Sequence, residues 1–345
     1  MARPSQQVAF FEVKPWEQED LQSHLADLAL RFFPGILDEQ AASQVSEVPI
    51  ISVFIRSHLT RAVLDRLPNL RFIATRSTGY DHIDLMAARE RGIVVSNVPH
   101  YGANTVAEYT FGLILCLARK IIQANQRALR GEVSLEGLEG FDLYGKTLGV
   151  VGTGSIGMHV VRIARGFGMD VLAYDVKPQP LLAEVPGFAF TSLDDLLRRS
   201  DIVTLHAPST PQTHHLMNRK RFALMKRGSL VINTARGEII DTAALLWALD
   251  DGILAGAGLD VVEGEDLVAE EERLLVAPGT EDKLRTLLCH HALLRRENVV
   301  ITPHAAFYSH EAMQRILDTT VSNIHGFLAG QLQNVVSGAR ATAVA

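Results

Sequence analysis

Three short segments of this 345-residue chain carry polar residues of types that could bind the carboxylate of a small organic acid and exchange a proton with it. They are VINTARGEIID with Arg236, AGLDVVEGED with Asp260 and Glu265, and VVITPHAAFY with His304. The rigid fork of an arginine suits a carboxylate, and its charge can polarise a neighbouring carbonyl. An imidazole gives and takes a proton near neutral pH, and a carboxylate on its far nitrogen would fix its tautomer. We therefore interpret Arg236, Glu265 and His304 as a candidate acid–base site.

Each of these residues also has a purely structural interpretation. An arginine before a glycine is often a surface turn, and a histidine is often a hydrogen-bonded structural residue. The acidic run Glu263–Glu272 has the pattern of a solvated loop. Taken together, however, the three side chains supply what hydride transfer to a 2-keto acid requires. These parts are an anchor for the carboxylate and a proton donor for the oxygen that becomes negative.

The strongest local motif is LGVVGTGSIG, Leu148 to Gly157, which lies between an apolar run and a helical pattern over 158–167. Gly152 allows a tight turn, Gly154 lets the backbone approach a pyrophosphate, and Gly157 permits close packing of helix on strand. The first amides of the helix would then face the phosphates. This context predicts a dinucleotide site rather than a plain glycine turn.

Asp175 supports that prediction. It stands eighteen positions after Gly157, at the end of the run DVLAYD. A carboxylate there can accept hydrogen bonds from the ribose hydroxyls, and it repels a 2′-phosphate, which favours NAD over NADP. Lys177, two residues further on, partly opposes that preference.

Short apolar runs alternate with helical patterns along the chain, which is typical of parallel sheets covered on both faces. The segment 105–122, TVAEYTFGLILCLARKII, is predicted as one long buried helix that separates two series of strands. A final helix over 310–328 could return to the first domain. We expect one domain from 1–104 with 309–345 and another from 105–308. The predicted strands are 8–11, 50–55, 72–75 and 94–97, followed by 148–151, 171–174, 202–205, 230–233, 257–260 and 299–302.

The composition excludes several classes of protein. A net charge of -6 and a pI near 6.1, with scattered basic residues, give no nucleic-acid-binding surface. Cys116 and Cys289 have no partners at metal-ligand spacing, so we expect neither a disulfide framework nor a metal site. No signal region or membrane-length apolar run is present, so we expect a cytoplasmic protein.

At this point the sequence closely resembles the family of D-isomer-specific 2-hydroxyacid dehydrogenases. The resemblance covers nearly the whole chain and is strongest to the D-lactate and D-2-hydroxyisocaproate members. It rests on ordered motifs: FFEVKPW, ATRSTGYDHIDL, VPHYGANTVAE, GKTLGVVGTGSIG, LHAPSTPQTHHLMN, NTARGEIID, GLDVVEGE and ITPHAAFY.

The resemblance implies two Rossmann-like α/β domains, a flavodoxin-like substrate-binding domain and a dinucleotide-binding domain, with a cleft between them. It implies Arg236 as substrate anchor, Glu265 as partner carboxylate and His304 as proton donor. It further implies a homodimer formed through the helix 105–122. It implies that the backbone amides around Thr78 and Gly79 bind the substrate carboxylate. It also implies that Tyr101 and Phe307 shape the substrate pocket. The residues that it implies as contacts of NAD are Ser155, Ile156, Asp175, Ala207, Pro208, Thr213, Thr234, Ala235 and Asp260.

The leading functional hypothesis is a D-lactate dehydrogenase that reduces pyruvate with NADH. A reductase of glyoxylate, hydroxypyruvate or a branched 2-keto acid would share every catalytic residue and differ in the pocket. A non-catalytic NAD-sensing scaffold, like the C-terminal-binding-protein corepressors, could also retain the triad. Function therefore has to be argued from the site rather than from the fold.

Overall fold

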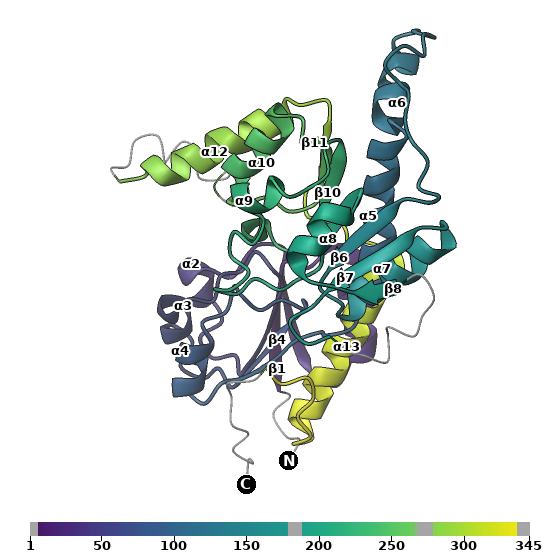
Figure 1. Ribbon diagram of the computed structural model, residues 1–345. Coiled ribbons are helices and arrows are strands. Elements are labelled where there is room, and N and C mark those ends of the chain that lie inside the picture. Colours follow the sequence, from purple (N-terminus) through teal and green to yellow (C-terminus); the bar gives the residue numbers. More distant parts are fainter. Residues whose placement is uncertain (1–5, 179–187, 266, 268–278, 337–345) are drawn as a thin grey trace, which may run out of the picture. The chain divides into compact units, whose positions relative to one another are not determined.

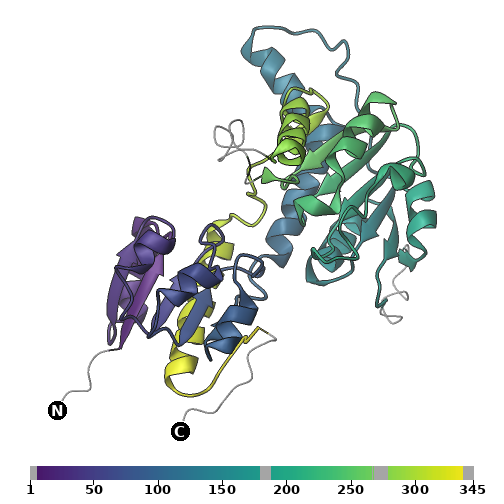
Figure 2. The same cartoon turned by 90° about the vertical axis from the view of Figure 1, so that its left-hand side faces the viewer.

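The computed structural model describes residues 6–178, 188–265, 267 and 279–336. The chain separates into two compact units, Met1–Tyr101 with Ser309–Ala345, and Gly102–Tyr308. Both ends of the chain belong to the first unit, where the last helix returns to it (Figures 1 and 2).

The first unit is built on a parallel sheet with the strand order β2-β1-β3-β4-β5. Its central strand, β3, has the sequence IISV and is buried along its whole length, as expected for a strand covered on both faces. Helices α2, α3 and α4 cover one face, while α1 and α13 cover the other (Figure 1). The bounds are β1 Gln7–Phe11, α1 Pro15–His24, β2 Ala29–Phe33, α2 Glu39–Ala42, β3 Ile50–Val53, α3 Arg61–Asp65, β4 Phe72–Thr75, α4 Leu85–Glu90, β5 Val94–Ser96 and α13 His310–Leu328.

The strand order of this unit reverses between β1 and β3, which is where open α/β sheets bind ligands. Here the carboxylate of Glu12 occupies that position. It accepts hydrogen bonds from the backbone N–H groups of Phe54 (3.1 Å), Arg56 (2.9 Å) and Ser57 (3.1 Å). The buried Arg76 donates to the carbonyls of Phe11 and Glu12 directly beside it. The amides that could bind an anion at this switch point are therefore already satisfied by the chain itself.

The second unit has a parallel sheet with the order β12-β11-β10-β9-β6-β7-β8. Helices α5 and α7 pack on one face, and α8, α9, α10 and α12 contribute to the core on the other. The bounds are α5 Ala103–Ala118, α6 Ile121–Leu129, β6 Thr147–Val151, α7 Ser155–Gly166, β7 Asp170–Tyr174, β8 Phe188–Phe190, α8 Leu193–Arg199, β9 Ile202–Leu205, α9 Arg219–Phe222, β10 Ser229–Asn233, the short 3-10 helix η2 Gly237–Ile239, α10 Thr242–Asp250, β11 Leu254–Leu259, α12 Glu281–Leu294 and β12 Val299–Ile301.

Because all the strands of this sheet are parallel, the loops that follow them emerge at one edge. The glycine turn follows β6, and Asp175 follows β7. Arg236, Glu265 and His304 follow β10, β11 and β12, which are neighbours in the sheet. The topology thus gathers the candidate residues of this unit at its carboxyl edge.

The two parallel sheets that the sequence predicted are confirmed, and each predicted strand is present with its ends within three residues. Strands β2 and β8 were not predicted. The predicted helix 105–122 is wrong at its end, because α5 stops at Ala118 and α6 begins at Ile121. Within the described residues, no helix is both long and apolar enough to cross a bilayer.

Candidate active site

His304 and Glu265 are in direct contact in the second unit. The Nδ1 atom of His304 lies 3.0 Å from Oε1 of Glu265, and about a third of the histidine side chain is exposed. With Nδ1 directed at the carboxylate, Nε2 is the ring nitrogen that can meet a ligand. The ring edge also packs against Phe307, with 6.3 Å between the ring centroids. This is the arrangement that an oriented acid–base histidine requires.

The backbone of His304 is held by Asp260. This aspartate is 1% exposed, and its carboxylate accepts hydrogen bonds from Thr302 Oγ1 (2.6 Å), Ala305 N (2.8 Å) and Ala306 N (2.9 Å). Its carbonyl accepts the N–H of His304 at 2.9 Å. His304 has a φ of +52°, a left-handed conformation that non-glycine residues rarely adopt without such support. Asp260 therefore holds the backbone from which the imidazole projects.

Arg236 follows β10 in an extended conformation, just before η2. The buried side chain of Asn233 donates to the Arg236 carbonyl (2.9 Å) and accepts from the Ala235 N–H (3.1 Å). Gly237 lies so close to the next loop that a Cβ there would be 2.4 Å from the Val262 carbonyl carbon. The turn that carries Arg236 is thus fixed on both sides.

The glycine turn after β6 has the shape of a dinucleotide cradle. Gly152 has a φ of +96°, and a Cβ on Gly157 would lie 2.0 Å from the Gly152 carbonyl oxygen, so neither position accepts a side chain. Gly154 has open space around its Cβ position. The first α7 hydrogen bond is donated by Met158, which leaves the N–H groups of Ser155, Ile156 and Gly157 outside the helical ladder.

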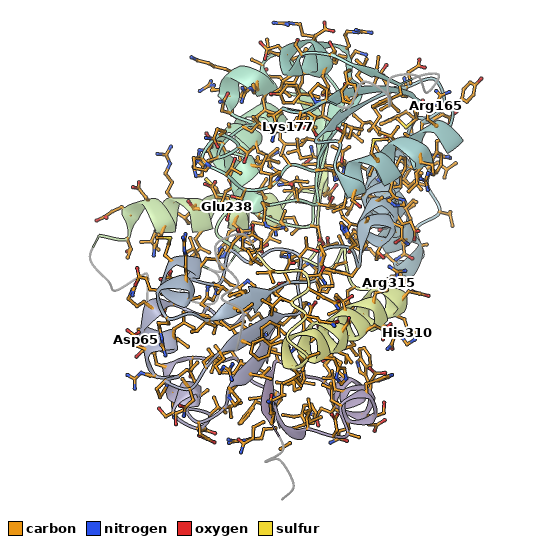
Figure 3. The ribbon with its side chains drawn as sticks, turned by 90° about the horizontal axis from the view of Figure 1, so that it is seen from below. Asp65, Arg165, Lys177, Glu238, His310 and Arg315 are labelled. Carbon is orange, nitrogen blue, oxygen red and sulfur yellow. The ribbon has the colours of Figure 1, made fainter. Side chains whose placement is uncertain are left out.

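Asp175 lies at the end of β7, beside this turn. Its Oδ2 accepts hydrogen bonds from Thr153 N (2.7 Å) and Thr153 Oγ1 (3.0 Å), and its Oδ1 accepts from the N–H of Lys177, labelled in Figure 3 (2.9 Å). Burial alone would raise the pKa of Asp175, but the hydrogen bonds from Lys177 and Thr153 outweigh it and hold the pKa below its ordinary value. An ionised carboxylate at this position fits an unphosphorylated adenosine ribose.

The remaining predicted cofactor residues lie on the loops after β9 and β10. Thr213 accepts the Thr210 N–H at 2.8 Å and lies 2.6 Å from the Pro208 carbonyl, so its hydroxyl shapes the loop that contains Ala207 and Pro208. Thr234 is buried against α5, where its hydroxyl lies 3.0 Å from that of Thr110. Together with the glycine cradle, these loops fit a bound NAD.

Thr78, Gly79 and Tyr101 belong to the first unit. The Thr78 hydroxyl donates to the Val98 carbonyl (2.8 Å), and the Gly79 carbonyl accepts from Ser77 Oγ (2.6 Å). In the described part of the chain, the N–H groups of Thr78 and Gly79 have no acceptor. The carbonyl of Tyr101 accepts a hydrogen bond from Arg315 of α13 (Figure 3).

His206 is a half-buried residue directly after β9 that the sequence did not single out. Its Nε2 lies 2.9 Å from Thr204 Oγ1, while its Nδ1 is buried without a partner in the described structure. Burial lowers the pKa of His206 to about 3, so the ring is neutral. The sequence feature that could have identified His206 is its position directly after a buried strand and before Ala207–Pro208.

Comparison with known proteins agrees with this geometry. Residues 111–306 match the family model of the D-isomer specific 2-hydroxyacid dehydrogenase, NAD binding domain. A 2-hydroxyacid dehydrogenase homolog of Haemophilus influenzae is 38% identical over 95% of this chain and 98% of its own length. The D-lactate dehydrogenase of Escherichia coli is 36% identical over 94% and 97%. A glyoxylate reductase of Thermococcus kodakarensis is 34% identical over 93% and 88%. The structure of a D-lactate dehydrogenase from Aquifex aeolicus complexed with NAD and lactic acid has a TM-score of 0.83 and 37% identity, and the match covers 94% of this chain and 96% of that one.

Proposed function

The chain belongs to the D-isomer-specific 2-hydroxyacid dehydrogenases, NAD-dependent oxidoreductases that act on the CH–OH group of D-2-hydroxy acids, and we propose that its substrate pair is pyruvate and D-lactate. The observation that carries the proposal is the 3.0 Å contact of His304 with Glu265, beside the loop of Arg236. A proton donor is needed for a carbonyl substrate. The similarity to D-lactate dehydrogenases of two organisms supports pyruvate in particular.

We propose the following role for each residue in pyruvate reduction. The guanidinium of Arg236 binds the substrate carboxylate and polarises the carbonyl. NADH, when bound, supplies the hydride that the carbonyl carbon receives. His304 transfers a proton from Nε2 to the carbonyl oxygen as that oxygen becomes negative, and Glu265 stabilises the imidazolium before the transfer. The neutral imidazole then takes up a proton from solvent, and lactate oxidation runs through the same steps in reverse.

The remaining assignments are proposals of the same kind. We propose that 105–308 is the NAD-binding domain and that 1–104 with 309–345 is the substrate-binding domain. In the latter, the N–H groups of Thr78 and Gly79 would bind the substrate carboxylate, and Tyr101 would shape the pocket with Phe307. The predicted NAD contacts of Ser155, Ile156, Asp175, Ala207, Pro208, Thr213, Thr234, Ala235 and Asp260 are proposed alongside them.

A kinetic panel tests the substrate. NADH oxidation is measured with pyruvate, 2-ketoisocaproate, phenylpyruvate, glyoxylate and hydroxypyruvate, with NADPH in parallel and a His304→Gln preparation as the control for contaminating activity. We expect the highest kcat/KM for pyruvate with NADH. A higher value for glyoxylate would favour the second candidate function, a glyoxylate reductase, to which the identity with the Thermococcus kodakarensis enzyme gives support.

We also propose that the chain forms a homodimer through the predicted helix 105–122 and its continuation, in which α6 and residues 130–135 are covered. No residue of α6 is buried, and large apolar side chains there are exposed, among them Leu129 (80%), Val133 (95%) and Leu135 (81%). Several large exposed apolar side chains this close together in the sequence favour an interface. Light scattering should give a dimer, and Leu129→Glu with Leu135→Glu should shift it toward monomer. A wild-type monomer at micromolar concentration would contradict the proposal.

The state of the two cysteines supports the proposal of a cytoplasmic location. Cys116 and Cys289 are both free thiols, and burial raises the pKa of each. Free, weakly reactive thiols suit a reducing compartment. Cell fractionation with a compartment marker tests this proposal.

A further inference from the structure

Glu263 forms a second polar cluster beside the candidate site, and the sequence pattern assigned it to a solvated loop. Its Oε1 lies 2.6 Å from Nε2 of His215, and its Oε2 accepts hydrogen bonds from Thr242 Oγ1 (3.0 Å) and Thr242 N (3.3 Å). Only 20% of the Glu263 side chain is exposed. Glu263, the first acidic residue of the run, is therefore hydrogen-bonded within the protein rather than solvated. The rest of the run, apart from Gly264, Glu265 and Leu267, lies outside the described residues.

These contacts join the loops that follow three adjacent strands. His215 comes from the loop after β9, Thr242 begins α10 after β10, and Glu263 follows β11. Further hydrogen bonds fasten the same loops together, because His215 N donates to the Glu238 carbonyl (2.8 Å) and Met217 N donates to the Ile239 carbonyl (2.9 Å). Glu238 itself lies in η2 (Figure 3).

The cluster is close to both Arg236 and Glu265 along the chain. Glu263 precedes Glu265 by two residues, and a Cβ on Gly237 would lie 2.6 Å from the Glu263 backbone nitrogen. The backbone after Arg236 therefore rests directly on the backbone of Glu263. If Glu263 moved, the loop of Arg236 and the loop of Glu265 would both have to move, because their backbones are packed in direct contact.

The short contact between His215 and Glu263 is that of a hydrogen bond and not that of two ligands of one metal ion. His214, His215 and Glu263 have ligand atoms within 4.8 Å of one another, and the His214 and His215 rings stack with 4.0 Å between centroids. In a tetrahedral zinc shell with bonds of about 2.0–2.1 Å, neighbouring donor atoms are about 3.3 Å apart. A separation of 2.6 Å is instead that of a charge-assisted hydrogen bond.

We propose that Glu263 is a positioning residue, which holds the loops of Arg236 and Glu265 in their mutual placement through His215 and Thr242. The inference rests on the proposed roles of Arg236 and Glu265. Glu263 is not expected to touch substrate. It acts because a misplacement of about 1 Å in either loop lowers the rate of the reaction about 100-fold.

Three variants separate geometry from charge. Glu263→Ala removes all three bonds and should lower kcat/KM for the keto acid about 100-fold, with KM raised and kcat lowered together. Glu263→Gln can still accept from Thr242 and contact His215, so it should recover activity to within about fivefold of wild type. His214→Ala, in the same loop, is the matched control and should stay within about twofold. NADH affinity, followed by its fluorescence, should change less than about threefold in all of them.

Hydrogen exchange gives a readout that does not depend on turnover. In Glu263→Ala, amides of 236–240 and of 262–265 should exchange at least ~10-fold faster together, while those of β6 and β7 stay as in wild type. If the wild type reduces no 2-keto acid, the proposed function fails, and the exchange data still decide whether Glu263 joins the two loops.

Several results would overturn the proposal. One is a Glu263→Ala enzyme within threefold of wild type, and another is equal impairment of the Ala and Gln variants, which would indicate charge rather than placement. A uniform rise in exchange across the unit would indicate general destabilisation. Inhibition by micromolar zinc chloride that His214→Ala abolishes would show that the cluster is a metal site.

Discussion

A methyl group added at Gly157 should weaken both the packing of α7 and the binding of the cofactor. In Gly157→Ala the new Cβ would lie 2.0 Å from the Gly152 carbonyl oxygen, whereas real contacts of this kind are at least 3.0 Å. The start of α7 and the turn must therefore move apart by at least 1.0 Å. The opposing atom is backbone, so no side chain can relieve the overlap by rotating.

The size of the effect follows from what that movement disturbs. Helix α7 is packed through Val160, Val161 and Ala164, so shifting it should lower the free energy of unfolding by about 1–3 kcal/mol. The N–H groups of Ser155 and Ile156 would move by a similar distance from the pyrophosphate position. We expect NADH affinity to fall at least ~100-fold, which is about 2.7 kcal/mol of binding free energy.

Two other glycines of the same segment provide controls. Gly154 and Gly166 have nothing within 4 Å of their Cβ positions, so alanine should change the free energy of unfolding by less than about 1 kcal/mol at either. Gly154→Ala should weaken NADH about 10-fold if the open space at its Cβ position is where the pyrophosphate binds, as we propose, and Gly166→Ala should leave NADH affinity unchanged. Fluorescence titration and urea denaturation measure the two quantities. Normal NADH affinity in both Gly154→Ala and Gly157→Ala would refute the reasoning.

Three further predictions concern the acid–base site and its surroundings. His304→Gln should lower kcat at least ~100-fold if His304 supplies the proton, and near-normal turnover across pH would exclude that role. Arg236→Ala should raise KM and lower kcat together in steady-state kinetics, whereas an intact kcat/KM would remove it from the site. The folded protein keeps His206 neutral while the unfolded chain takes up a proton below the ordinary histidine pKa, so stability should fall as pH falls from about 6.5 toward 3. Urea denaturation at pH 7 and pH 5 should therefore show that wild type loses up to about 2 kcal/mol more than His206→Gln, and identical losses would contradict the burial argument.

The sequence predicted the strands that local pattern can reveal, including the edge strands β5 and β12, and missed β2 and β8 at the opposite edges of the two sheets. Strand β3, IISV, is an uninterrupted apolar run that is buried throughout, and its type is clear without any tertiary information. The edge strand β2, ALRFF, is only half-buried along its length, and β8 has just three residues. No residue of β2 and only the first residue of β8 is buried, so the sequences of these two strands carry a weak apolar pattern.

The break between α5 and α6 arises from a contact that is remote in sequence. The backbone N–H of Phe141 donates to the Ala118 carbonyl at 2.9 Å, and a Cβ on Gly140 would lie 2.2 Å from that oxygen. The returning segment thus takes a carbonyl that would otherwise continue the helix, and Lys120 adopts a φ of +52°. Apolar periodicity runs through this point without interruption, so it could not predict the break.

Much of the candidate site could be predicted because each residue follows a recognisable strand. Glu265 and His304 were paired on chemical grounds, and they lie in contact. What the sequence could not supply is the set of long-range bonds that orient them. The bonds from Asp260 to Ala305 and Ala306, and from Glu263 to His215, span more than 40 residues, and no local pattern encodes them.

Chiral analysis of the product tests the central claim most directly. The purified protein is given pyruvate and NADH, and the lactate formed is resolved on a chiral column. Exclusive D-lactate, in a 1:1 ratio to NADH oxidised and formed at least ~100-fold more slowly by His304→Gln, is the result we predict. L-lactate, a racemic product, or NADH consumption without lactate would contradict the proposed D-lactate dehydrogenase function.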